Sequence, residues 1–284
     1  MEVTSSQPQA RAIQWNAKLP RLHVAACTDK GRVRLNNEDS YHVCPDQNLF
    51  VLSDGMGGAA KGEVASAMAV ETVGVSLRQN PSLALPGKPE FSDETNSLIH
   101  AIQLANRKIH EQGARDPASR GMGATIVAVR ISGNRASLAH VGDSRVYLFR
   151  AHTLQQLTSD HSLVAEQVRQ GLMTHQQAAA SELQSVLTRA LGMEESVEVD
   201  AEEMELLPGD SLLLCSDGLT RMVPENEIAA ALAQAPDVAI AAERLVRRAN
   251  ECGGLDNITV VVIHLAKTKG WLAKFFPWGS ANLV

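Results

Sequence analysis

Features that the sequence lacks exclude several classes of protein. No apolar run approaches the ~20 residues that a membrane-spanning helix needs, and residues 1–20 contain no apolar stretch of signal-peptide length. The four cysteines lie far apart, form no Cys-x-x-Cys pair and mostly sit within apolar segments. We therefore expect a cytoplasmic protein with reduced thiols and no transmembrane segment.

The chain also lacks an excess of positive charge and a nucleotide-binding loop. Its formal net charge is -6 at pH 7, so no long-range attraction to nucleic acid or to an anionic membrane is expected. Glycines are frequent at 55–62, but the Gly-x4-Gly-Lys-Ser/Thr pattern is absent. These observations argue against a nucleic-acid partner and against an NTPase.

What is present suffices for one large domain. With 284 residues, 44% of them hydrophobic, the chain can bury a sizeable core. Residues 1–20 are polar and aperiodic, which predicts a flexible N-terminal arm before a domain at 21–266. Residues 267–284 form an aromatic C-terminal tail with two of the three tryptophans. Docking on a partner or a membrane surface and packing against its own domain are both open for this tail.

Apolar periodicity within the domain predicts an alternation of strands and helices. Turn clusters at 132–134 and 142–144 each separate two strand-like segments, so both predict hairpins with antiparallel neighbours. Residues 79–92 predict a surface loop, and 160–192 predict an insertion of short helices. The predicted strands are 22–27, 49–53, 124–131, 136–141, 145–149, 197–206, 211–215 and 257–265, and the predicted helices are 63–77, 93–111, 225–233 and 237–250.

Three aspartates stand at the ends of apolar runs. Asp54 and Asp217 follow strand-like segments, and Asp256 precedes one. A carboxylate at the tip of a buried strand loses several kcal/mol of solvation unless a positive charge meets it. Aligned strands could bring the three tips together, and a hard divalent metal ion is the simplest partner for them.

Other polar residues occur in short motifs with turn formers. Glu38 and Asp39 follow the cation Arg34, and Asp143 lies in a Gly-Asp-Ser-Arg turn. The glycines after Asp54 let backbone carbonyls approach an ion without a Cβ in the way. Each motif alone is typical of ordinary turn chemistry, so their order along the chain carries the signal.

In that order the motifs resemble the metal-dependent serine/threonine protein phosphatases of type 2C, in their bacterial form. The resemblance covers about residues 22–265. It implies an α+β fold in which two packed antiparallel β-sheets are flanked by helices, an α-β-β-α sandwich with the site in a cleft at one end. The insertion at 160–192 would correspond to the family's flap beside the cleft.

The resemblance also implies a set of metal ligands. Two Mn²⁺ or Mg²⁺ ions would occupy the core site, and a third ion is implied for bacterial members. Oxygen ligands of this kind suit Mg²⁺ or Mn²⁺. By position, Asp54 would bridge the two core ions, the Gly55 carbonyl would bind one of them, and Asp217 with Asp256 would complete the other. Glu38 and Asp39 would act mainly through metal-bound waters. The third ion would be held by Asp143, Asp217 and Ser185.

The implied activity is hydrolysis of phosphoserine and phosphothreonine in proteins, which reverses a protein kinase. A hydroxide held between two ions would attack phosphorus in line, while Arg34 matches phosphate oxygens with its planar fork. A surface salt bridge of Arg34 to Glu38 or Asp39 is the alternative. We expect phosphoproteins and a cognate Ser/Thr kinase as partners, and a monomer.

One position departs from the family pattern. Many eukaryotic relatives have a histidine after the Asp-Gly, a candidate acid for the leaving group, whereas this chain has Met56. A thioether cannot donate a proton. Metal-bound water or another residue must then act, and His161 is a candidate, although a surface or satisfied core histidine is the commoner case.

Two other functions are compatible with parts of the sequence. Cys215 and Arg221 formally satisfy the Cys-x5-Arg signature of cysteine-dependent phosphatases, but the apolar run before Cys215 predicts a buried, unreactive thiol. A catalytically silent phosphoprotein-binding module could use the same cleft. The number of like charges held together argues against it, because binding alone does not need them.

Overall fold

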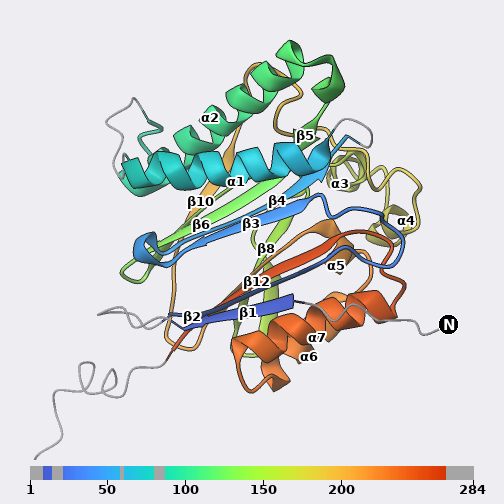
Figure 1. The fold of residues 1–284 in the computed structure, drawn as a ribbon. Coiled ribbons are helices and arrows are strands. Elements are labelled where there is room, and N and C mark those ends of the chain that lie inside the picture. Colours follow the sequence, from blue (N-terminus) through green and yellow to red (C-terminus); the bar gives the residue numbers. More distant parts are fainter. Residues whose placement is uncertain (1–8, 15–21, 58–60, 80–86, 267–284) are drawn as a thin grey trace, which may run out of the picture.

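Two antiparallel β-sheets pack face to face, and helices cover both outer faces (Figure 1). This is a computed structural model, and it describes residues 9–14, 22–57, 61–79 and 87–266. The α+β sandwich predicted from the sequence is confirmed. In the described part of the chain, no helix is long and apolar enough to cross a membrane.

The strands fall into two sheets of six, and every pair of neighbours is antiparallel. The short β5 (Gly123–Ala124) pairs with the end of β4. The first sheet has the order β1 (Gln9–Gln14), β2 (Leu22–Asp29), β12 (Ile258–Leu265), β11 (Ser211–Cys215), β8 (Arg145–Arg150) and β9 (Thr153–Gln156). The second has the order β10 (Asp200–Glu205), β7 (Arg135–Val141), β6 (Ile126–Ser132), β4 (Leu49–Met56) and β3 (Asp39–Cys44).

Central strands are apolar on both faces because each sheet is covered on both sides. In β4, Phe50 and Leu52 belong to the core between the sheets, whereas Leu49 and Val51 pack on the helix side. Side chains alternate between the two faces of a strand, so a strand buried on both sides becomes a continuous apolar run. Such runs end at the site, which is why acidic residues follow them directly.

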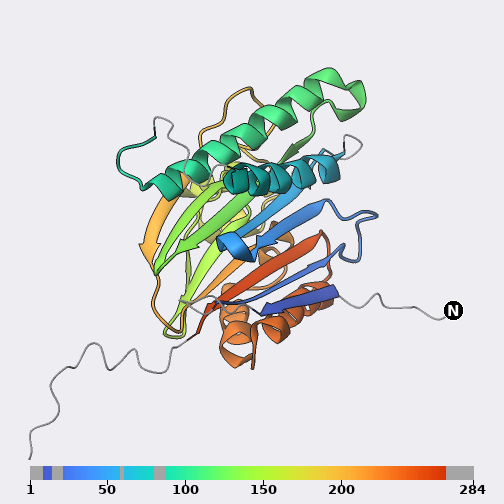
Figure 2. The same ribbon diagram turned by 60° about the vertical axis from the view of Figure 1, so that its left-hand side comes forward.

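Helices form the outer layers (Figure 2). On the second sheet lie α1 (Gly62–Gln79) and α2 (Asp93–Arg115), and on the first lie α5 (Asp217–Thr220), α6 (Glu225–Gln234) and α7 (Val238–Glu251). The α7 residues Ala241, Leu245 and Ala249 recur on one face and are buried against the first sheet. Two single 3-10 turns lie at Pro45–Gln47 and Pro117–Ser119.

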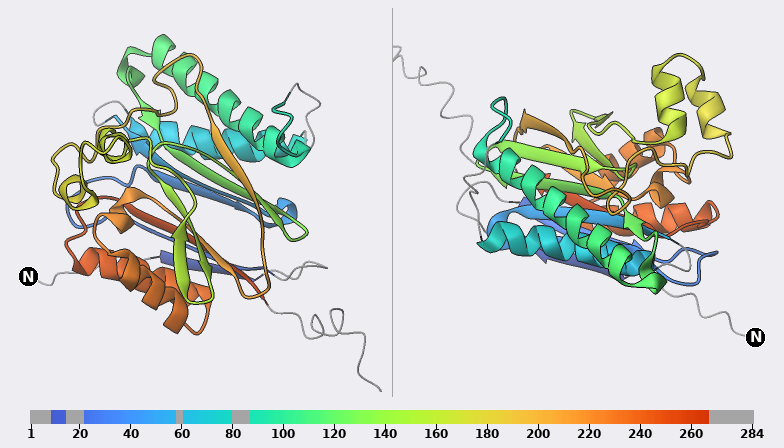
Figure 3. Two further views of the ribbon diagram at one scale, coloured as in Figure 1. Left: turned by 180° about the vertical axis from the view of Figure 1, so that it is seen from behind. Right: turned by 90° about the horizontal axis from the view of Figure 1, so that it is seen from above.

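The flap is built from two short helices between β9 and β10. These are α3 (Leu163–Arg169) and α4 (His175–Ala179), which project from the sandwich in Figure 3. Each begins with a side chain that caps the helix: Ser162 accepts from the backbone of Ala165, and Thr174 from that of Gln177. The short-helix insertion was predicted from the sequence at this position.

The hairpin predicted at 142–144 was wrong. β7 belongs to the second sheet and β8 to the first, so the turn carries the chain from one sheet to the other. Gly142 has a φ of 103°, which favours glycine, and a Cβ there would lie 2.7 Å from the Thr125 side chain. Turn residues alone do not tell a hairpin from a crossover, because both need the same tight reversal.

Three strands were not predicted from the apolar periodicity of the sequence. Residues 9–14, placed in the flexible arm, form β1 on the open edge of β2. β3 begins Asp-Ser-Tyr-His, and β9 is only four residues long. Edge strands pair through the backbone, so they need no apolar alternation to form. The tail at 267–284 lies outside the described residues.

Candidate active site

A hollow of about 150 Å³ opens at the end of the sandwich, and flap residues form part of its lining. It gathers residues from β4, from the turn between β7 and β8, from the flap, and from the segments that begin α5 and precede β12. Its lining is Arg34, Glu38, Asp54, Gly55, Met56, Gly57, Thr125, Asp143, Ser185, Leu187, Asp217, Arg221, Asp256 and Asn257. All predicted site residues except Asp39 therefore border one hollow.

Asp39 lies next to this lining, opposite Asp54 across the β3–β4 pair. Its Oδ2 accepts a hydrogen bond of 2.8 Å from Oγ of Ser216, the residue before Asp217. No donor within the described ranges meets the buried Oδ1. A buried carboxylate oxygen without a hydrogen-bond partner lowers the stability of the fold, so a cation or a donor that reached this oxygen would be stabilising.

Asp54 is anchored through its backbone. Its N–H donates to Oγ1 of Thr125 at 3.0 Å, and its carbonyl accepts from the Thr125 N–H at 2.8 Å. Oγ1 of Thr125 is also 2.7 Å from Oγ of Ser144, which ties β4 to the turn that carries Asp143. The backbone is thus fixed by neutral groups, and the Asp54 carboxyl is left to face the other acids.

Asp217 and Asp143 are both buried, with 9% and 7% of their surface exposed. Asp217 is the first residue of α5, and no donor in the described part of the chain meets its Oδ1. Nη2 of Arg221 lies 2.5 Å from the other oxygen of Asp217 and 3.7 Å from Oδ2 of Asp143. Arg221 was not predicted from the sequence to belong to the acidic site.

Two glycines allow backbone segments to meet at the hollow. A Cβ on Gly55 would lie 2.1 Å from the carbonyl oxygen of Gly62, and one on Gly218 would lie 2.0 Å from that of Asn257. Real side chains cannot come so close. The Asp-Gly pairs of the sequence therefore reflect close packing around each aspartate as well as turn formation.

Asn257 organises the loop that carries Arg34 and Glu38. Its Nδ2 donates to the carbonyls of Lys30 and Asn36 at 3.0 and 2.8 Å, and its Oδ1 accepts from the Glu38 N–H at 2.8 Å. No role was predicted for Asn257 from the sequence. A polar amide directly before an apolar strand was the available signal.

Arg34 stands at the rim. Its Nη2 donates to Oδ2 of Asp256 at 2.8 Å, and 52% of its side chain is exposed. This pairing differs from the surface salt bridge to Glu38 or Asp39 that the sequence left open. An exposed guanidinium beside the acids can turn one fork toward an incoming phosphate.

Burial and mutual repulsion raise the pKa of the clustered carboxyls. Burial is the main cause for Asp39, with a pKa of about 7, and for Asp143, with a pKa of about 8. It also raises the pKa values of Asp54 and Asp217, with Asp39 adding to the repulsion on Asp54. Asp54 keeps some accessible surface, but protein atoms crowd its carboxyl. A divalent cation would offset the repulsion between these carboxylates, and their all-oxygen donor set fits Mg²⁺ or Mn²⁺.

Ser185 and Met56 also reach the hollow. Ser185 lies in an exposed turn of the flap, where the sequence favoured a plain surface position on a helix. Met56, where a proton donor was sought, also borders the hollow. The flap therefore contributes directly to the cavity wall.

His161 does not suit the role of leaving-group acid. It is 4% exposed and does not border the hollow, and its Nδ1 accepts from the Gly142 N–H at 3.1 Å. Burial is the main cause that lowers the pKa of its ring to about 4. A neutral, buried imidazole whose two nitrogens are engaged cannot serve the cavity, but it steadies the turn before Asp143.

Next to this turn, His140, His161 and Asp200 place one ligand atom each within 4.8 Å of one another. Nη1 of Arg189 lies 2.5 Å from Oδ1 of Asp200 and 3.1 Å from Nε2 of His161. The two imidazoles are stacked with centroids 4.8 Å apart. The arginine already supplies the positive charge that a metal ion would bring.

The rival nucleophile is also excluded. Cys215 is fully buried in the core between the first sheet and its helices, and burial raises the pKa of its thiol to about 12. It does not border the hollow. A neutral thiol that faces away from the acids cannot attack a phosphate there.

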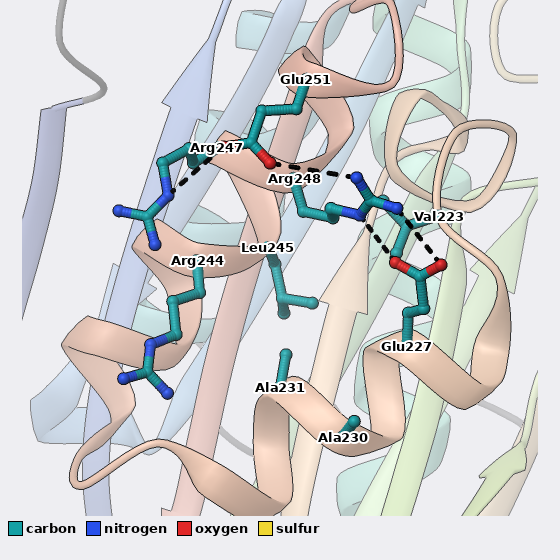
Figure 4. A pocket seen from close by; sticks show the side chains of 9 residues that line it. All are labelled: Val223, Glu227, Ala230, Ala231, Arg244, Leu245, Arg247, Arg248 and Glu251. Atoms are coloured by element: carbon teal, nitrogen blue, oxygen red, sulfur yellow. Dashed lines mark hydrogen bonds and ion pairs between the residues drawn. The ribbon is translucent and has the colours of Figure 1, made fainter.

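A larger groove of about 320 Å³ lies between α6 and α7 and shares no lining residue with the acidic hollow (Figure 4). Its arginines mostly pair with glutamates: Arg248 with Glu227 at 2.6 Å, and Arg247 with Glu251 at 3.8 Å. The paired charges leave this groove without a cluster of free catalytic groups.

Comparisons with known proteins agree with the geometry. Residues 28–258 match the family model described as protein phosphatase 2C. The chain is 38% identical to protein phosphatase PhpP of Streptococcus pneumoniae over 247 residues, which cover 86% of this chain and 98% of PhpP.

Solved structures are similar as well. The serine/threonine phosphatase PstP/Ppp of Mycobacterium tuberculosis shares 40% identity with a TM-score of 0.77, covering 88% of this chain and 100% of that one. A catalytic domain of PstP in complex with two manganese ions shares 38% identity with a TM-score of 0.73, covering 87% of this chain and 99% of that one. By sequence match and by fold, the chain belongs to the protein phosphatase 2C family.

Proposed function

We propose that this protein hydrolyses phosphoserine and phosphothreonine in phosphoproteins at the acidic hollow, and so reverses a protein kinase. Membership of the protein phosphatase 2C family supports this activity. The observation that carries it to this site is the convergence of buried carboxyls with raised pKa values beside an exposed Arg34. Such a site attracts cations within and a phosphate at its rim.

The carboxyls would hold divalent ions. We assign Asp54 to bridge two of them, the carbonyl of Gly55 to one, and Asp217 with Asp256 to the other. Glu38 and Asp39 would act through water, and Asp143, Asp217 and Ser185 would hold a third ion. The unpartnered oxygens of Asp39 and Asp217 support this assignment. When bound, the ions supply an activated water and offset phosphate charge.

The chain's own side chains then position the substrate. Arg34 would leave Oδ2 of Asp256 in part and donate to two phosphate oxygens. Asn257 would keep the Arg34 loop in place through its three hydrogen bonds. Neither Met56 nor His161 offers a proton to the leaving serine or threonine, so that proton would come from water in the site.

Other attributes follow as part of the same proposal. Cys27, Cys44, Cys215 and Cys252 are all free thiols, which supports a reducing, cytoplasmic location. We further propose a monomer with a cognate Ser/Thr kinase as its counterpart. No observation favours the catalytically silent binding module.

Activity on a phosphothreonine peptide and on p-nitrophenyl phosphate tests the proposal. We expect hydrolysis that requires Mn²⁺ or Mg²⁺, that EDTA abolishes, and that iodoacetamide leaves intact. Loss of activity to iodoacetamide alone would instead support a cysteine nucleophile. No hydrolysis at any metal concentration would contradict the enzymatic assignment.

A further inference from the structure

Arg221 places a permanent positive charge among the metal-binding carboxylates proposed above. Nη2 lies 2.5 Å from Oδ2 of Asp217 and 3.7 Å from Oδ2 of Asp143, and Nη1 lies 3.9 Å from Oδ2 of Asp256. Only 24% of the side chain is exposed. One guanidinium therefore reaches three carboxylates from three separate segments of the chain.

The local backbone directs Arg221 to this position. Its N–H donates to the carbonyl of Asp217 at 2.9 Å, which closes the single turn of α5. Residues four apart on a helical turn lie on the same face, so the side chains of Asp217 and Arg221 point the same way. Leu219 and Val223 are buried in the core on the other side.

The guanidinium and a divalent ion compete for the same cluster of carboxylates. Arginine stays protonated at all accessible pH values, so it can offset part of the acidic charge without a metal. Oδ1 of Asp217 has no donor in the described residues, so an ion can bind that oxygen while Arg221 pairs with Oδ2. The ion would then lie close to the positive guanidinium, so its binding must overcome electrostatic repulsion from Arg221.

We propose that Arg221 is a built-in counter-cation: it holds the carboxylates together in the metal-free protein and moves aside when a divalent ion enters. The inference rests on the proposed metal site. It makes Arg221 a residue that sets metal affinity, separate from the ligands themselves. The Arg221 guanidinium stabilises the metal-free fold and, because it competes with the ion, lowers the affinity of the site for the metal.

Manganese binding by calorimetry, together with thermal unfolding of the metal-free protein, tests this role. The variants are Arg221→Gln, which removes the charge, and Arg221→Lys, which keeps it. We expect Arg221→Gln to bind Mn²⁺ about tenfold more tightly, within the range found for coupled charged contacts. Its metal-free form should melt at a lower temperature than the wild type. Arg221→Lys should lie closer to the wild type in both measurements.

The outcomes separate this inference from the proposed function. If Arg221→Gln matches the wild type in affinity and in metal-free melting, or binds Mn²⁺ more weakly, the counter-cation role is wrong while the metal site stands. If the wild type binds no Mn²⁺, the proposed metal site fails and this inference fails with it.

A measurement on the wild type guards against a variant that does not fold. The arginine Nε–H signals are followed by NMR during titration with diamagnetic Mg²⁺, and the Arg221 signal is assigned by through-bond correlation to its backbone in the wild type. We expect this signal to shift and to exchange faster with water as Mg²⁺ fills the site. A signal that stays fixed to saturation would overturn the proposal.

Discussion

Asp39 lies directly opposite Asp54 in the antiparallel pair of β3 and β4. Opposite residues of such a pair point to the same face, so the sheet itself forces two carboxyls together. Asp39 is, after burial, the largest contributor to the raised pKa of Asp54. The register of β3 and β4 therefore places two carboxylates where they repel each other, and a bound cation would offset this repulsion.

Replacing Asn257 should loosen the substrate-binding loop. Asn257→Ala removes three hydrogen bonds to the loop, two of them through Nδ2. We expect the free energy of unfolding to fall by about 2 kcal/mol, because backbone groups are left without partners. KM should rise as Arg34 loses its fixed position. Chemical denaturation and steady-state kinetics measure both effects.

Asn36→Ala is the matched control, because its exposed side chain lies in the same loop. It should leave stability within about 0.5 kcal/mol of the wild type. Equal losses in the two variants would show that Asn257 has no special role.

Arg34→Ala should chiefly raise KM. In the proposed site the guanidinium would bind the phosphate and take no part in activating the attacking water. We expect KM to rise at least about tenfold, since a hydrogen bond to a charged group contributes about 1.5–3 kcal/mol, with a smaller change in kcat. Arg34→Lys should recover only part of the loss, because an ammonium lacks the planar fork. A fall in kcat at unchanged KM would place Arg34 in the chemical step instead.

Gly218→Ala should be strongly destabilising. Its Cβ would lie 2.0 Å from the carbonyl oxygen of Asn257, a backbone atom that cannot step aside. We expect a loss of about 3 kcal/mol or more in unfolding free energy. Gly113→Ala serves as control, because its Cβ would approach Ser119 O no closer than 3.3 Å and lies in helix α2. Similar melting temperatures for the two variants would show that the tight contact is not required.

The pair of His140 and His161 should make the protein sensitive to acid. Burial lowers the pKa of both rings, to about 4 for His161. A folded-state pKa below the unfolded value of about 6.5 gives stability that is present above pH 6.5. That stability is lost as the pH falls toward 4, because unfolding lets the rings take up protons. Denaturation between pH 7 and pH 4.5, compared with His161→Gln, measures this loss.

The variant should lose less stability than the wild type across that range. An NMR titration of the wild type should show His161 neutral at pH 5.5. Protonation of His161 near pH 6.5 would contradict the account of its burial.

The sequence predicts this fold best where strands are buried on both faces. β4, β11 and β12 are continuous apolar runs, and the acids at their tips follow from that burial. β1 and β3 lack such a signal because they lie at sheet edges. The turn at Asp143 was predicted as a hairpin because its residues do not reveal which sheet the next strand joins.

The site residues likewise include some that the sequence predicts and some that it does not. Asp54, Asp217 and Asp256 stand out by their position at strand ends. The hydrogen bonds of Asn257 join positions 219 to 227 residues apart, and Arg221 meets Asp143 and Asp256 from other segments of the chain. No local pattern encodes such a meeting, so only the folded arrangement reveals it.

The most direct measurement of the central claim is release of phosphate from a phosphothreonine peptide by the wild type and by Asp54→Asn, with Mn²⁺ present. We expect metal-dependent turnover by the wild type. The variant should fold but lose more than about a hundredfold in activity, since even the outer partners of a metal site contribute 10–100-fold. Folded Asp54→Asn that retains wild-type turnover would contradict the assignment of the acidic hollow as the active site.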